Sequence, residues 1–164
     1  MKAKLFVTLI TLLVIIISCQ KKFDIEIEKS AVNVVINDIE KVFETNDAEL
    51  LSKLVSHNPD NIFFGTDAAE RFVGYDNFIE AQKRFFSSVE KGGEITFRDI
   101  VTKIGKNGDV AWVSFFMDWK GKSQGEPFAY EGIRMTIVLE KQEEKWLIVH
   151  LHGSIPVSGQ SVKY

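Results

Sequence analysis

The second half of the chain is a series of strand-like segments joined by tight turns, and this feature constrains the fold most. Apolar and polar residues alternate over four segments, at 95–104, 110–120, 128–140 and 146–152. The first turn contains Asn107-Gly108, the dipeptide that most strongly indicates a short hairpin. Consecutive strands joined by short turns pair antiparallel. The pattern therefore predicts an antiparallel meander, whose apolar face needs a second layer to cover it.

The first half of the chain supplies that second layer. Apolar residues recur at steps of three and four from Ser30 to Phe43, and Asp47 is a suitable N-cap for a short second helix. Two short strands are expected at 62–64 and 71–73, followed by a third helix that Asp76 caps. The predicted fold class is α+β, a curved antiparallel sheet packed on one side against three N-terminal helices.

Composition and motifs exclude several classes of protein. The single cysteine leaves no intrachain disulfide and no multi-cysteine zinc module. The formal net charge of -3 argues against a nucleic-acid partner, since no basic stripe is present to neutralise phosphates. The chain also lacks a P-loop, a dinucleotide-binding glycine motif and a nucleophile elbow. We therefore predict no cofactor.

The N-terminal sequence indicates where in the cell the protein is located. Lys2 and Lys4 precede an apolar run, Leu5 to Ile17, that is shorter than the roughly 20 residues a membrane-spanning helix needs. The segment ending at Cys19 resembles the lipobox of bacterial lipoproteins, in which the cysteine is acylated and becomes the first mature residue. A plain signal peptide with an incidental cysteine and a short membrane anchor are the alternatives.

The lipoprotein resemblance implies a division of the chain and a location. Residues 1–18 would be the signal peptide, 19–29 a tether, 30–157 the folded domain and 158–164 a C-terminal tail. Acylated Cys19 would anchor the domain in a lipid membrane of the bacterial cell envelope. Gln20, in the second mature position, resembles the outer-membrane type of lipoprotein.

The body of the chain resembles a known family. The order of helices, hairpin, helix and meander, with the phrases Gly65-Thr66-Asp67, Phe72-Val73-Gly74 and Trp146 to His152, is similar to SnoaL-like proteins of the nuclear transport factor 2-like superfamily. The resemblance covers about residues 30–157 and implies the cystatin-like roll, with a conical cavity between sheet and helices. It also implies a homodimer. Members include ketosteroid isomerase, polyketide cyclases, dehydratases and non-catalytic association domains, so fold alone does not assign a function.

Alternation along the last two strands suggests which side chains enter that cavity. Tyr130 and Arg134 share one face of their strand, and His150 and His152 share one face of the next. We expect these four side chains to line the cavity mouth as ligand-binding or catalytic groups, with Arg134 and His152 as cross-strand neighbours. The opposite face, a run of apolar residues that includes Ile133, Met135 and Ile137, is then a dry core or the dimer interface.

The strand 110–120 offers two possible inward faces, which alternation alone does not separate. One carries Trp112 and Asp118, and the other carries Ala111 and Trp119. Trp112 is a candidate ligand contact if the first face points inward.

Each candidate residue has a chemical and a structural interpretation. His150 is a candidate general acid or base, or a histidine that holds the last strand by a hydrogen bond. Asp67 is a candidate base, or a turn residue that caps backbone groups. Arg134 binds an anionic ligand, or pairs with Asp118 or Asp67. His150 and His152 have metal-ligand spacing but no evident third ligand, so no metal is predicted.

Three functions are consistent with these residues. The first is a membrane-anchored module that binds an unidentified small molecule or mediates assembly. The alternative is a cofactor-free isomerase, cyclase or hydrolase that uses His150, Asp67 or Tyr130 as acid or base. The third is a structural dimer whose cavity is filled by its own aromatic side chains. An open cavity with a carboxylate or histidine pointing into it would favour the enzyme.

Overall fold

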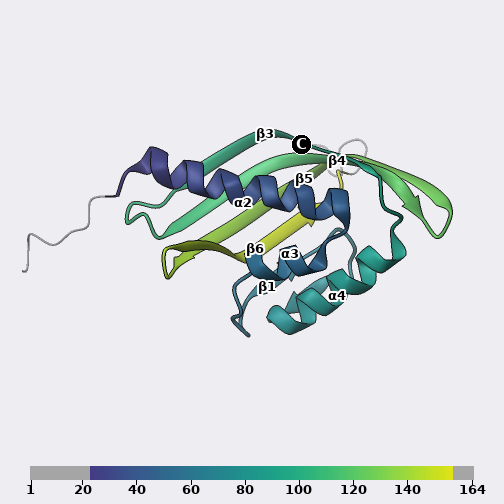
Figure 1. The fold of residues 1–164 in the computed structure, drawn as a ribbon, viewed down its shortest axis with the longest axis horizontal. Helices are drawn as coiled ribbons and strands as arrows, with labels where there is room; N and C mark the ends of the chain where they lie inside the picture. Colours follow the sequence, from purple (N-terminus) through teal and green to yellow (C-terminus); the bar gives the residue numbers. More distant parts are fainter. Residues whose placement is uncertain (1–22, 157–164) are drawn as a thin grey trace, which may run out of the picture.

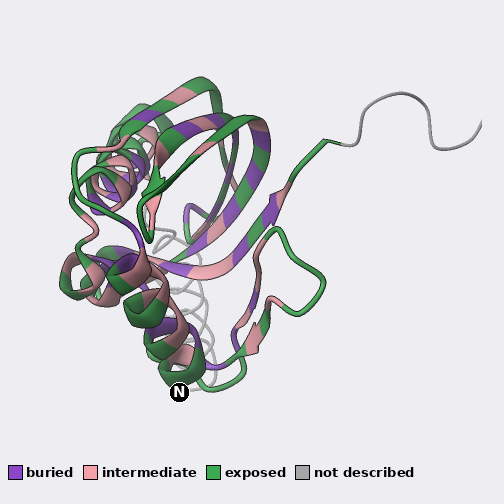
Figure 2. Cartoon of the chain, turned by 90° about the vertical axis from the view of Figure 1, so that its right-hand side faces the viewer, coloured by how far each residue is buried: buried purple, intermediate pink, exposed green. Residues whose placement is uncertain are grey.

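The computed structural model describes residues 23–156, and these form three helices beside one sheet (Figure 1). The helices are α2 (Ile25–Thr45), α3 (Ala48–Leu54) and α4 (Tyr75–Ser88). The strands are β1 (Ile62–Phe64), β2 (Arg71–Val73), β3 (Glu94–Ile104), β4 (Val110–Ser123), β5 (Glu126–Gln142) and β6 (Lys145–Ser154). The predicted α+β class, with the helices packed on one side of a strongly curved sheet, is confirmed (Figures 1 and 2).

The sheet is mixed rather than purely antiparallel. Its strand order is β2-β1-β6-β5-β4-β3, and the meander from β3 to β6 pairs antiparallel as expected. β1, however, pairs parallel to β6, with Phe63 beside Leu151. Parallel neighbours need a long connection, and the chain through α4 and the first three meander strands provides it. A strand of three residues gives too little pattern to predict which edge it joins.

Helix α2 begins at Ile25, five residues before the predicted start. The Asp24 side chain caps it by accepting hydrogen bonds from the backbone N–H groups of Glu26 (2.9 Å) and Ile27 (3.4 Å). Glu28 in the first turn is buried. Residues 25–29, expected in the tether, are therefore part of the domain. Cys19 and Gln20 lie outside the described residues.

Of the predicted N-caps of the other two helices, one is confirmed and one is wrong. Asp47 caps α3 as predicted, because its carboxylate accepts the Leu50 N–H at 2.8 Å. The prediction that Asp76 caps α4 is wrong, since Gly74 is the N-cap and Asp76 lies in the first turn. Gly74 has a φ of 83°, and a Cβ there would lie 2.9 Å from the Pro59 carbonyl oxygen. Glycine therefore suits both the backbone conformation and the close contact.

The core lies between the helices and the inner face of the sheet. Buried and exposed residues alternate along the strands in Figure 2, because successive side chains point to opposite faces. From α2 the core receives Val32, Ile36, Ile39 and Val42, and from β4 Ala111, Val113, Phe115, Met117 and Trp119. The inward face of β4 is thus the one that carries Ala111 and Trp119. β5 contributes Ile133, Met135, Ile137 and Leu139, which are all buried.

Candidate functional site

A cavity of about 180 Å³ lies between the inner face of the sheet, α4 and the loop that joins β1 to β2. Its walls are largely aromatic and aliphatic, and its polar lining comes from the loop, from Gln82 on α4 and from Tyr130 on β5. This volume is below the roughly 300 Å³ of a typical drug-sized site. It exceeds the roughly 150 Å³ of an engineered apolar cavity that holds benzene. The cavity therefore has room for a molecule of about one ring.

A β-bulge in β5 separates Tyr130 from Arg134. Trp119 pairs with Tyr130 and Met117 with Ile133, so β5 has one residue more than β4 between these pairs. Gly132 lies in the bulge with a φ of 69°, a conformation that few other residues adopt readily. Beyond the bulge, the β5 residues that strict alternation would place on one face of the sheet lie on the other. Tyr130 lines the cavity and Arg134 is exposed on the outer face, so the expectation that both enter one pocket is wrong.

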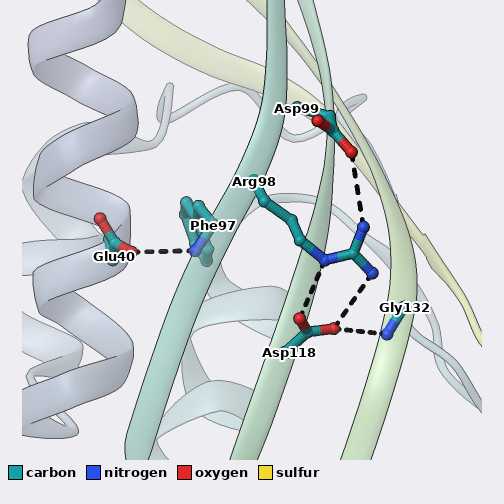
Figure 3. Close-up of polar contacts among 6 residues, drawn as sticks. All are labelled: Glu40, Phe97, Arg98, Asp99, Asp118 and Gly132. Carbon is teal, nitrogen blue, oxygen red and sulfur yellow. Dashed lines mark hydrogen bonds and ion pairs between the residues drawn. The ribbon is translucent and has the colours of Figure 1, made fainter.

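Asp118 and Arg98 hold this bulge in place (Figure 3). The Asp118 carboxylate accepts the Gly132 N–H at 2.6 Å and pairs with the Arg98 guanidinium at 2.9 and 3.4 Å. These hydrogen bonds, led by that from Arg98, lower the pKa of Asp118, and Asp118 in turn raises the pKa of Arg98. Asp118 is therefore the partner of Arg98. The expected pairing of Asp118 with Arg134 is not found among the hydrogen bonds and ion pairs of residues 23–156.

The same figure shows a hydrogen bond from the β3 edge of the sheet to helix α2. The backbone N–H of Phe97 donates to the Glu40 carboxylate on α2 at 3.0 Å (Figure 3). A helix side chain thus satisfies a donor at an edge that would otherwise be open for pairing.

A second bulge, in β6, moves both histidines away from the cavity. Leu139 pairs with Ile148 but Val138 pairs with His150, so Val149 is an extra residue. Trp146, Ile148 and Leu151 are consequently buried on the inner side, whereas His152 is exposed. The predicted cavity position of His150 and His152 is wrong because strict alternation fails at this bulge.

The predicted pairing of Arg134 with His152 is also wrong. Arg134 pairs with Ser154, and Thr136 with His152. The turn contains two residues, Glu143 and Glu144, and both have positive φ. This turn and the β6 bulge each displace the register by one residue relative to a turn centred on Glu143. Arg134 and His152 share the outer face, away from the cavity.

His150 has a structural partner. Its Nδ1 atom lies 2.7 Å from the Ile62 carbonyl oxygen of β1. A carbonyl only accepts hydrogen bonds, so Nδ1 is the donor. The ring also contacts Phe64, at 6.2 Å between centroids. This geometry matches the structural interpretation of His150, and its role as acid or base stays an untested prediction.

Asp67 and Tyr130 are the two predicted site residues that line the cavity, and Trp112, like Arg134 and the two histidines, does not. Asp67 lines the cavity from the β1–β2 loop, and Tyr130 lines it from β5. Within residues 23–156 the Asp67 carboxylate caps no backbone group, and the backbone N–H of Asp67 donates to the Glu70 carboxylate at 3.0 Å. Trp112 is 45% exposed on the outer face of β4 and does not line the cavity.

Three polar lining residues, Thr66, Glu70 and Gln82, were missed by sequence reasoning. Gln82 occupies the same stripe of α4 as Phe78 and Phe85, at steps of four and three, so helical periodicity alone could have found it. Glu70 lies in an irregular loop and offers no comparable signal.

Of the two interpretations of the apolar run in β5, dry core or dimer interface, the structure supports the dry core. Ile133, Met135 and Ile137 point toward the helices and are buried within one chain. The outer face instead carries exposed apolar side chains, with Trp112 45%, Phe116 36% and Val101 49% exposed.

Within residues 23–156 neither a metal site nor a membrane-spanning helix is found. No three of their His, Cys, Asp and Glu side chains cluster closely enough to hold a metal ion. None of their helices is long and apolar enough to cross a membrane.

Comparison with solved structures places this geometry in a known fold. A nuclear transport factor 2 superfamily protein from Salmonella enterica is 18% identical, with a TM-score of 0.74 over 85% of this chain and 99% of that one. A putative dehydratase of the same family from Streptomyces avermitilis is 15% identical, with a TM-score of 0.70 over 81% and 99%. The association domain of C. elegans CaMKII is 20% identical, with a TM-score of 0.62 over 79% and 96%.

These likenesses establish the fold and leave the activity open, because each identity is low. No curated protein matches the chain. The family model of the SnoaL-like domain matches residues 32–158, which is most of the chain and includes all the strands and most of α2. The chain therefore belongs to the SnoaL-like domain family, and its fold is the one seen in the nuclear transport factor 2-like proteins.

Proposed function

We propose that this SnoaL-like domain binds a small, largely apolar molecule of about one ring in the cavity between the sheet and α4. The observation that carries the proposal is the lining, which combines aromatic side chains such as Phe85 and Trp119 with the few polar groups of the β1–β2 loop. Ligand sites combine apolar walls with a few polar groups in this way. The unfilled volume of about 180 Å³ argues against a cavity closed by its own aromatic side chains.

A variant that narrows the mouth tests this proposal. Ile155 lines the cavity and is 39% exposed, so Ile155→Trp adds bulk without overpacking the core. Ile25→Trp makes the same exchange at a site 45% exposed on α2 and serves as the matched control. Titration of the full chain with benzyl alcohol should shift the Trp119 indole NMR signal, and Ile155→Trp alone should weaken binding. Absence of any cavity shift, or equal binding by all three proteins, would contradict the proposal.

A proton-transfer enzyme is the second candidate. Asp67 and Tyr130 both line the cavity, so a carboxylate and a phenol could act on one bound molecule as base and hydrogen-bond donor. His150 lies outside the cavity and is left out of this reaction. The test is deuterium incorporation next to the carbonyl of cyclohexanone in D₂O. Exchange that Asp67→Asn abolishes would support an enzyme, and binding without exchange supports the binding module.

Membrane anchoring through acylated Cys19 is part of the proposal. Its support is the lipobox-like sequence before Cys19 and the start of the domain at Ile25, a few residues later. Fractionation of cells that express the full chain should recover it in the outer membrane of the envelope. Cys19→Ser should abolish fatty-acid labelling and release the protein from the membrane fraction. Unchanged labelling and location would refute the anchor.

We further propose that two copies pair through the outer face of the sheet. The exposed apolar side chains of Trp112, Phe116 and Val101 favour burial there, and a stable interface buries about 1,200 Å² or more in total. Sedimentation should give a dimer at tens of micromolar, and Trp112→Glu should give a monomer. Val34→Glu, at an apolar residue of α2 that is 56% exposed, is the matched control and should leave the dimer intact. A monomeric wild type would refute this pairing.

A further inference from the structure

Aromatic rings form a large part of the cavity walls. Phe72 and Phe85 contribute from β2 and α4, and Trp119 and Tyr130 from β4 and β5. The face of an aromatic ring carries negative electrostatic potential, most strongly in tryptophan, and attracts cations that approach it. Walls of this kind accept apolar groups, and they also tolerate a positive charge better than aliphatic walls do.

The charges at the cavity have a single sign. Asp67 and Glu70 line it, and among residues 23–156 no lysine, arginine or histidine does so. Among the salt bridges of residues 23–156, none involves either carboxylate. An anionic ligand would therefore meet repulsion with no compensating cation, and Arg134, the expected anion-binding residue, is on the outer face.

The Glu70 carboxylate is positioned by its own loop. One of its oxygens, Oε2, accepts the Asp67 N–H at 3.0 Å, and the Gly65 N–H donates to the Glu70 carbonyl at 2.9 Å. A Cβ on Gly65 would overlap the Glu70 carboxylate, so glycine leaves the space that this side chain occupies. The other oxygen, Oε1, has no hydrogen-bond partner among residues 23–156. Oε1 is therefore a hydrogen-bond acceptor whose position is fixed by the loop, at the lining of a cavity with aromatic walls.

From these features we infer that the cavity selects a small organic cation, a protonated amine on an apolar body of about one ring. The ring lies among the aromatic walls, and the ammonium group faces Glu70 and Asp67. The inference rests on the proposed function and specifies its ligand class. A charge-assisted hydrogen bond at a half-buried carboxylate should favour the amine over a neutral analogue by about tenfold.

Three probes of similar size and different charge test the inference. Benzylamine is protonated at neutral pH, benzyl alcohol is neutral and benzoate is anionic. Calorimetric titration of the full chain should show benzylamine binding about tenfold more tightly than benzyl alcohol, with benzoate weakest. The preference should shrink as salt is raised, because part of the attraction is screened.

Charge-removing variants locate the source of the preference. Glu70→Gln keeps an oxygen for the Asp67 N–H and should reduce severalfold both the affinity for benzylamine and the preference for it over benzyl alcohol. Glu80→Gln removes one negative charge from an exposed residue of α4 that pairs with Arg84, and it should change neither. Equal binding of benzylamine and benzyl alcohol would overturn the inference and leave the proposed function standing. A preference that survives in the double variant Asp67→Asn, Glu70→Gln would also overturn it. Failure of all three probes to bind would overturn both.

Discussion

Glu28 should anchor the start of α2 to the last hairpin of the sheet, and its removal should cost substantial stability. Its carboxylate accepts hydrogen bonds from Lys141 Nζ at 2.6 Å and from the indole N–H of Trp146 at 2.9 Å. Glu28 is only 8% exposed, and Trp146 is 5% exposed. Glu28→Ala would leave the buried indole N–H without its acceptor and would break the ion pair with Lys141.

The expected loss follows from these two contacts. A buried hydrogen bond to a charged group contributes about 1.5 to 3 kcal/mol. The Lys141 side chain is 22% exposed, so its ion pair adds at most about 1 kcal/mol. Glu28→Ala should therefore lower the free energy of unfolding by about 2 to 4 kcal/mol. Glu28→Gln retains an oxygen for Trp146 and should lose less.

Urea unfolding of the full chain, followed by circular dichroism, measures this effect. Glu26→Ala is the matched control on the same helix, because that side chain is 74% exposed and, among residues 23–156, pairs with Lys29 alone. It should cost about 0.5 kcal/mol or less. Equal losses for Glu28→Ala and Glu26→Ala would refute the reasoning and would be consistent with a tether at residues 25–29.

The effect should depend on pH in a definite direction. The Lys141 hydrogen bond is the main cause that lowers the pKa of Glu28 below its usual 4.5, and the same contact raises the pKa of Lys141 above 10.5. The carboxylate contribution is therefore present above pH 4.5 and is lost as the pH falls through the lower folded-state value. The lysine contribution is present below pH 10.5 and is lost as the pH rises through the raised value. The difference between wild type and Glu28→Ala should shrink only outside this window.

Three further predictions concern the bulges and the last strand. Gly132→Ala should lower the free energy of unfolding by about 1 to 2 kcal/mol, because the φ of 69° disfavours alanine although the nearest atom to its Cβ is 3.6 Å away; an unchanged urea midpoint would contradict this. The Gly132 amide NMR signal should titrate with the Asp118 carboxyl at a pH below 3.8, the usual carboxyl pKa, and a titration above that value would contradict the assigned hydrogen bonds. His150→Ala should cost about 1 kcal/mol through the lost bond to Ile62 and leave benzyl alcohol affinity unchanged; a large loss of affinity would place His150 in the site.

The helices and the meander could be predicted because their patterns are local. Side chains repeat every 3.6 residues on a helix and every two on a strand, so the apolar stripe of α2 and the strands β3 to β6 are visible without any knowledge of packing. The first turn of α2 was missed because its buried member is a charged residue, Glu28, which hydrophobic periodicity does not count.

The candidate site was predicted only in part, because bulges are not visible in the alternation of residues. Asp67 was assigned to the first hairpin loop and does line the cavity. Tyr130 also lines it, but for a reason the sequence did not show, since the β5 bulge sends Tyr130 inward and Arg134 outward. In β6, the extra residue Val149 has the same effect on the histidines.

The sequence by itself determined the elements of this protein, their order and its family, because each element is encoded by neighbours along the chain. Only the tertiary structure decided which face of each strand encloses the cavity. One extra residue in a strand reverses inside and outside for all that follow, and the contacts that hold the β5 bulge, such as Asp118 with Gly132, join residues far apart in sequence. The charge at the cavity was decided in the same way, since folding brings Glu70 to its lining and leaves Arg134 on the opposite side of the sheet.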